Sequence, residues 1–273
     1  MTTPMANRDF VLDARIYHSS FFRSLRSEIR KLTCLRSFWI NHIIMIVGYT
    51  LIMWAVGATS RSALDAYAGD YSLPISEAVT AGISFIIIFP IVQGVLAVTN
   101  EYASNTMRTT TLSDPRRGRA FSAKMLAVGI LSGISVGIMT VLSTLVFMVT
   151  SGISWNADSN DLRPLVVFWL VLTLAAVMSA GLGYAIRSTA GSIMLALVGL
   201  YLSTMVAIIN LDWIQDTLIH YMPLNVISTA TSSGSFVMAD GSGISWSTAT
   251  IAWVLYTVVI GALGFIRYSR SDV

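Results

Sequence analysis

Charged side chains are scarce in this chain: only 11% of its 273 residues are charged, whereas a soluble domain typically carries about 25%. Hydrophobic residues make up 55% of the chain, and the mean hydropathy is +0.71. This composition is typical of integral membrane proteins. It leaves no room for a soluble domain of ordinary size, and we expect no nucleic-acid partner.

Cysteine, lysine and histidine are also rare, and each scarcity excludes a kind of site. The single cysteine, Cys34, excludes an intramolecular disulfide. The only lysines, Lys31 and Lys124, do not lie in the G-x-x-x-x-G-K-[ST] loop that holds ATP phosphates. The three histidines fall on different sides of the predicted membrane spans, without H-E-x-x-H spacing. We therefore expect no metal site, no bound cofactor and no catalytic residue in this chain.

Long apolar runs dominate what is present. A helix needs about 20 apolar residues to cross the hydrocarbon core of a bilayer. Six runs reach this length, and a polar leader of residues 1–37, too long for a cleavable signal peptide, precedes them. The sequence predicts a single all-α membrane domain over residues 1–273, with six transmembrane helices at about 38–58, 78–99, 124–150, 164–186, 190–210 and 247–267.

Basic residues are distributed very unequally between the two sides of these spans. Fifteen of the 17 lysines and arginines lie in the leader, in the connections after the second and fourth spans, and in the tail; the other two are Arg61 and Arg163. Cytoplasmic segments carry the excess of Lys and Arg. We therefore expect a multi-pass protein of the plasma (inner) membrane with both termini in the cytoplasm.

The segment before the first span has the pattern of an amphipathic helix. Its apolar residues recur at steps of three and four, at Phe22, Leu25, Ile29 and Leu32. Its basic residues fall largely off this stripe, as expected for a helix in the plane of the lipid headgroups; they are Arg23, Arg26, Arg30 and Lys31. A plain membrane-anchoring flank and a helix that also touches a cytoplasmic partner both fit this pattern.

Two of the spans contain residues with a packing or pathway role. Gly129, Gly133 and Gly137 form overlapping G-x-x-x-G patterns, which allow close helix contact in lipid; we expect packing within one chain rather than a dimer seam. Pro90 predicts a bend in the second span, and Gln93 is able to bond to a neighbouring helix. Lining of a pathway is the alternative role of these residues.

The span interiors contain no Asp, Glu, Lys or Arg, since Lys124 is counted with the loop before the third span. Ion-coupled carriers usually keep such residues at depth. Their absence argues against a secondary transporter and favours an apolar or amphipathic cargo. In the last outer loop, residues 211–246 are long and apolar for an exposed segment, and we expect short helices that re-enter the outer leaflet.

The connection between the second and third spans is polar and basic, "EYASNTMRTTTLSDPRRGRAFSAK" at 101–124. Glu101 follows the second span so closely that the helix is expected to continue into the cytosol, with an acid near the start of a short helix. Asp114-Pro115 then marks a turn. The sequence predicts a rigid cytoplasmic projection fixed to two spans.

At these residues the chain resembles a known family. The pattern E-Y-x-x-x-T-x-R-x-T-x-L-x-x-P-R-R-x-R from Glu101 resembles the first cytoplasmic loop of bacterial ABC type-2 transporter permeases. The leader "LRSEIRKLTCLRSFW", the segment "YMPLNVIS" at 221–228 and the tail "FIRYSRSDV" are similar to the family's corresponding segments, so the resemblance covers essentially the whole chain. One departure is Asn105, where the family commonly has glycine.

The resemblance implies a function. Residues 101–115 would form a coupling helix seated on a separate ATPase dimer, which would bind the ATP and Mg²⁺ that this chain does not bind. A second permease, the same chain or a sister chain, would complete an exporter of antimicrobial peptides, drugs or lipid-like molecules, surrounded by membrane lipids. A non-transporting immunity or sensor protein and an intramembrane enzyme are the alternatives. The matching coupling positions are Glu101, Tyr102, Thr106, Arg108, Pro115 and Arg116.

Overall fold

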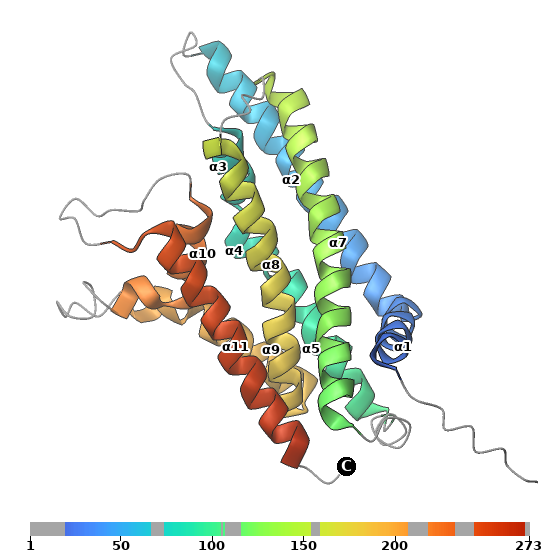
Figure 1. The fold of residues 1–273 in the computed structure, drawn as a ribbon. Coiled ribbons are helices and arrows are strands. Elements are labelled where there is room, and N and C mark those ends of the chain that lie inside the picture. The colour runs from blue at the N-terminus through green and yellow to red at the C-terminus, as the bar shows by residue number, and fades with distance from the viewer. Residues whose placement is uncertain are drawn as a thin grey trace, which may run out of the picture.

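The computed structural model describes residues 20–66, 74–104, 106, 116–153, 159–206, 218–232 and 243–270. Within these ranges every regular element is a helix (Figure 1). The elements are α1 (Phe21–Thr33), α2 (Arg36–Ala66), α3 (Ile75–Thr80), α4 (Ile83–Ile86), α5 (Ile88–Ala103), α7 (Arg117–Ser151), α8 (Ser159–Ile186), α9 (Thr189–Val206), η2 (Ile219–Tyr221), α10 (Pro223–Thr231) and α11 (Trp246–Arg270).

Four of the described helices, α2, α7, α8 and α11, are long and apolar enough to cross a membrane. The pair formed by α3–α4 and α5 passes the same test as one bent span, which makes up to five. The apolar part of α9, Thr189–Leu202, is shorter than the about 20 residues that a crossing needs. The all-helical membrane class is confirmed, whereas the fifth predicted span, at 190–210 and partly outside the described residues, stays a prediction, and with it the total of six.

The long helices form a bundle around α8. The helices α2 and α7 run side by side, α8 packs against α5, α7 and α11, and α1 lies near the lower ends of α2 and α7 (Figure 1). The core between them contains large, fully buried side chains, among them Tyr49, Phe147, Phe168, Leu172 and Trp253. Side chains on the outer faces of α2, α7 and α11 are also apolar and exposed, as expected where lipid replaces water.

One end of the bundle, at the bottom of Figure 1, collects α1, the end of α5, the start of α7, the α8–α9 turn and the end of α11. Arginines fasten these elements, since Arg117 Nη1 donates to the Ser269 carbonyl at 2.8 Å and Arg187 Nη2 donates to the Arg267 carbonyl at 3.3 Å. We call this the basic end, and the opposite one the outer end. The segments predicted to share one side of the membrane therefore share one end of the fold.

The second predicted span is broken rather than merely kinked. Its two halves meet at a bend of 44° at Ile87, three residues before Pro90. A bend is expected at this place because proline has no backbone N–H to donate and its ring crowds the preceding turn. Irregular backbone inside a membrane protein needs partners from its neighbours. Side chains of other helices supply them: Tyr49 Oη donates to the Val79 carbonyl, Tyr201 Oη to that of Ser84 at 2.5 Å, and Asn41 Nδ2 to that of Phe89 at 3.2 Å.

Short helices pack at the outer end, in the loop where re-entrant helices were expected. Pro223 occupies the first turn of α10, where a missing N–H costs nothing, and Asn225 Nδ2 donates to the Ile219 carbonyl at 2.7 Å. The bond from Asn225 holds η2 against the start of α10, which gives the Pro-Asn segment a structural role. Residues 207–217 and 233–242 lie outside the described residues, and insertion of η2 and α10 into the outer leaflet stays a prediction.

The glycines of α7 face α8 of the same chain. The indole Nε1 of Trp169 donates to the Gly133 carbonyl at 2.7 Å, and a Cβ on Gly129 or Gly137 would meet α8 side chains at 3.4 Å. Gln93 differs from the expectation, because its buried amide has no hydrogen-bond partner among the described residues. The bond predicted from Gln93 to a neighbouring helix is therefore not observed.

Candidate functional site

At the basic end, the helices α5 and α7 extend beyond the apolar runs of the sequence. These extensions carry charged residues of the candidate site. The helix of the second span continues past residue 99 to Ala103, as predicted, and so carries Glu101. The next long helix begins at Arg117, earlier than the predicted 124. Lys124 was counted among the loop cations; it lies instead inside α7, with 2% of its side chain exposed. Apolar runs mark the part of a helix that faces lipid, and α7 extends beyond it.

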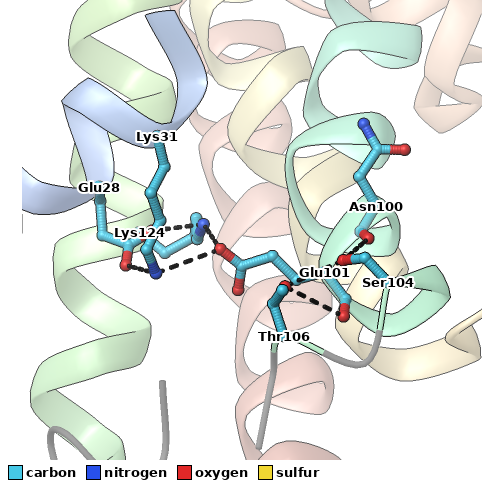
Figure 2. A network of polar contacts seen from close by, with 7 residues as sticks. All are labelled: Glu28, Lys31, Asn100, Glu101, Ser104, Thr106 and Lys124. Carbon is cyan, nitrogen blue, oxygen red and sulfur yellow. Dashed lines mark hydrogen bonds and ion pairs between the residues drawn. The ribbon is translucent and has the colours of Figure 1, made fainter. Parts of the chain in front are cut away.

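Four charged side chains from three helices meet there (Figure 2). Lys124 Nζ is 2.6 Å from Glu101 Oε1 and also contacts Glu28 Oε2. Lys31 Nζ is 2.7 Å from Glu28 Oε1 and 3.4 Å from Glu101 Oε1. We call these four residues the ion cluster. It uses both lysines of the chain and two of its three glutamates, and it joins α1, α5 and α7.

The ion cluster is balanced in charge and largely removed from solvent. The exposed fraction of the side chain is 7% for Glu28 and 12% for Glu101, whereas Lys31 retains 39%. Attraction between buried charges offsets the loss of their hydration only while every partner stays in place. Removing one member of such a pair typically costs about 3–5 kcal/mol. The cluster is therefore a rigid junction that tolerates the loss of Lys124 or Glu101 poorly.

Lys31 is the most exposed member, and its charge is secure at neutral pH. Burial opposes its ammonium form, but the bonds and negative charges of Glu28 and Glu101 outweigh burial and raise the pKa of Lys31 above 10.5. A raised pKa means that its contribution to stability is fully present below about pH 10.5 and is lost as the pH rises through the folded-state value.

Aromatic side chains surround the next residue, Tyr102. The Arg187 guanidinium lies 5.5 Å from the ring centroid of Tyr102, a cation–π distance. Arg187 has a φ of 61°, a left-handed conformation that costs free energy in a residue other than glycine. This conformation at the α8–α9 turn accompanies the contacts of Arg187 with α5 and α11. The Tyr102 ring contacts that of Tyr184 at a centroid distance of 6.4 Å. Tyr184 in turn packs in a group with Phe121, Phe265 and Tyr268, in which neighbouring ring centroids are 4.9–6.3 Å apart.

The polar connection leaves α5 directly beside the ion cluster. Ser104 Oγ donates to the Asn100 carbonyl at 2.7 Å, and the hydroxyls of Ser104 and Thr106 are 3.0 Å apart (Figure 2). Residues 105 and 107–115 lie outside the described residues. Glu101 precedes this connection and Lys124 follows it, so their 2.6 Å contact ties its two ends together.

The structure places the predicted site residues in three different surroundings. Glu101 is buried in the ion cluster and Tyr102 is half-buried, whereas Thr106 and Arg116 are exposed; Arg108 and Pro115 lie outside the described residues. On α1, Arg23, Arg26 and Arg30 are exposed, and Lys31 belongs to the ion cluster.

Two cluster residues, Glu28 and Lys124, were not singled out from the sequence. Weak signals existed, since Glu28 is the one acid within a strongly basic segment and Lys124 is the chain's last lysine. Neither signal identifies a partner.

These observations define a class of protein: a helical membrane protein whose polar connection at the basic end is clamped by buried ion pairs. A family model described as "ABC-2 family transporter protein" matches residues 23–273. The chain therefore belongs to this family, and the resemblance seen in the sequence is confirmed. Membership makes it the membrane component of an ABC transporter, with an ABC ATPase subunit as partner. No curated protein matches the chain.

Proposed function

We propose that the chain is the permease subunit of an ATP-driven exporter whose cargo is apolar or amphipathic: an antimicrobial peptide, a drug or a lipid-like molecule. ATP and Mg²⁺ bind the partner ATPase dimer, and this chain binds neither. A second permease, identical or a sister chain, completes the transport pathway. The family match supports the permease role, and the chain's own surfaces support the kind of cargo.

Two apolar grooves support a hydrocarbon-rich cargo. One, of about 510 Å³, lies between α7 and α8 and is lined by Gly137, Val141, Leu145, Leu165 and Trp169, among others. The other, of about 580 Å³, lies among α8, α9, α10 and α11. Their volumes fall within the range usual for binding sites of small molecules, about 300–1,000 Å³. Surfaces with so few polar groups favour apolar segments over hydrated ions.

The ion cluster is the proposed route by which force enters the helices. Residues 105–115 would receive motion from the ATPase when nucleotide binding closes its dimer. Because Glu101 and Lys124 clamp the two ends of this segment, α5 and α7 would move together, and Glu28 would carry α1 with them. The observation that carries this proposal is the buried 2.6 Å contact between Lys124 and Glu101, which join α5 and α7. Glu101 thus acts as an anchor, whereas Thr106 and Arg116 are exposed at the surface where the ATPase would bind.

A direct test is the ratio of transport to ATP hydrolysis in the purified complex with its ATPase. Glu101→Gln removes one buried charge and preserves the shape of the side chain. We expect the ATPase still to copurify, but transport per ATP to fall at least tenfold. The reason is that a small displacement of a positioned element can lower a rate by a large factor. Glu77→Gln, the same change on α3 at the outer end, is the matched control and should transport normally. Unchanged transport in Glu101→Gln would remove the coupling role from the cluster.

The proposed orientation has its own test in the native sequence. Cys34 is exposed at the basic end and is the chain's sole cysteine. If this end faces the cytoplasm, an impermeant maleimide should label Cys34 in inside-out vesicles and leave it unlabelled in intact cells. The reverse pattern would invert the proposed topology and place residues 105–115 beyond the reach of a cytoplasmic ATPase.

A further inference from the structure

An open, basic groove lies on α1, next to the ion cluster. It has a volume of about 510 Å³ and is lined by the side chains of Arg23, Arg26, Ser27, Arg30, Lys31 and Cys34, so that Lys31 belongs both to the groove and to the ion cluster. The three arginines are exposed, and no acidic side chain in the described part of the chain pairs with them. Arginine guanidinium groups bind phosphate through paired hydrogen bonds. The chemistry of the groove therefore suits an anion with paired oxygens, a phosphate or a carboxylate.

The position of this groove indicates which anion reaches it. Only Cys34 and Leu35 separate α1 from the membrane-spanning α2, and Trp39 Nε1 fixes the corner by donating to the Thr33 carbonyl at 2.8 Å. Phe22, which adjoins Arg23 on α1, is 77% exposed, and Trp39, at the corner between α1 and α2, is 53% exposed. Exposed aromatic rings beside basic side chains are typical of the membrane interface. An acidic protein surface would leave these rings in water, whereas a lipid bilayer would cover them.

We propose that the arginines at positions 23, 26 and 30 form a binding site for anionic phospholipid headgroups, and that Glu28 links the occupancy of this site to the coupling segment. The link is short. Glu28 lies on the buried side of the same helix and contacts Lys124 of α7 and Lys31. A headgroup that draws α1 toward the bilayer therefore holds Glu28 against the clamp around residues 105–115. This regulation rests on the proposed transport function, but the lipid site does not.

The binding test uses the full complex, with a fluorophore on Cys34, in nanodiscs of phosphatidylcholine alone or with one third phosphatidylglycerol. Nitroxide-labelled phosphatidylglycerol should quench the fluorophore more strongly than nitroxide-labelled phosphatidylcholine. Each basic residue near anionic lipid contributes roughly fivefold in binding, so R23Q/R26Q/R30Q should weaken the selective binding that the quenching reports by about 100-fold. Arg61→Gln at the outer end is the control. The variant R23K/R26K/R30K keeps the charge and should keep part of the binding.

The regulatory test is coupled ATPase activity in the same nanodiscs. Wild type should be more active with phosphatidylglycerol, and R23Q/R26Q/R30Q should lose this dependence while keeping the basal rate seen in phosphatidylcholine. Inorganic phosphate in solution should not replace the lipid. Equal quenching by both lipids in wild type overturns the site, and selective quenching without lipid-dependent activity overturns the link through Glu28.

Two further outcomes separate the hypotheses. If R23Q/R26Q/R30Q no longer copurifies with the ATPase in detergent, the arginines contact that protein and the lipid assignment is wrong. If wild type shows no coupled activity in any lipid, the proposed transport function fails, while the quenching experiment still decides the lipid site.

Discussion

The two ends of the bundle are held together by different kinds of contact. At the basic end, the ion cluster joins three helices, and a group of aromatic rings fills the space beside it. At the outer end, Arg163 donates to the Ser232 carbonyl at 3.0 Å and lies 4.6 Å from the centroid of the Trp246 ring. Buried ion pairs resist separation more strongly than such half-exposed contacts do. By these contacts, the basic end is held more strongly than the outer end.

Removal of Lys124 should have the largest effect on this comparison. Lys124→Met fills the space but leaves Glu28 and Glu101 facing each other without their buried cation. We expect a loss of about 3–5 kcal/mol of stability together with loss of coupled transport. Thermal unfolding in detergent and transport in proteoliposomes measure the two effects. Lys31→Met is the matched control, and its effect should be clearly smaller because Lys31 is 39% exposed. Equal effects of the two substitutions would show that burial does not set the strength of the basic end.

Next in size is the energetic coupling between Glu101 and Lys124. Residues that share one network give non-additive changes, typically by 0.5–3 kcal/mol, so the double variant E101Q/K124Q should be destabilised by about 1–3 kcal/mol less than the sum of the single changes. A double-mutant cycle on the unfolding midpoint tests this. Strict additivity would mean that the two side chains do not act as a unit.

Loosening the outer end should have a moderate effect of a different kind. Arg163→Gln removes the cation from the Trp246 ring and weakens the bond to the Ser232 carbonyl, a loss of about 1–3 kcal/mol. Transport per ATP should persist, while a cysteine placed at Ser247 should react faster with a water-soluble reagent, in a Cys34→Ser background. Should transport per ATP collapse as it does for Lys124→Met, the two ends do not differ in the way described here.

The smallest expected effect concerns pH. Because the pKa of Lys31 is raised above 10.5, the stabilisation lost in Lys31→Met should be constant from neutral pH up to about that value. Above it, the unfolding midpoints of wild type and Lys31→Met should converge. A difference that already shrinks between pH 7 and pH 9 would contradict the raised pKa.

Much of the fold was predictable because a run of about 20 apolar residues is by itself evidence of a helix that crosses the membrane. Within the described residues, each of the six runs lies in helical segments, and the unequal distribution of basic residues matches the grouping of segments at the basic end. Helix ends were less predictable. The helix α2 runs to Ala66 and α7 begins at Arg117, beyond the predicted limits of 58 and 124, because a helix continues past the point where its side chains stop facing lipid.

The ion cluster was not predictable for a different reason. Glu28, Glu101 and Lys124 are far apart in the sequence and come from three helices, so only the packing of α1, α5 and α7 brings them together. Each resembles an ordinary surface charge when taken alone. The resemblance of the 101–119 pattern predicts a contact surface for an ATPase, which stays a prediction; the buried ion pair of Glu101 with Lys124 is what the pattern does not reveal.

The most direct test of the central claim replaces the ionic clamp with a covalent one. In a Cys34→Ser background, E101C/K124C removes the buried pair, and a short bis-methanethiosulfonate reagent then links α5 to α7. Transport per ATP should be low before cross-linking, recover on cross-linking and fall again on reduction. Transport at the wild-type level before any cross-link forms would contradict the claim that the contact between Glu101 and Lys124 makes the two helices move as one.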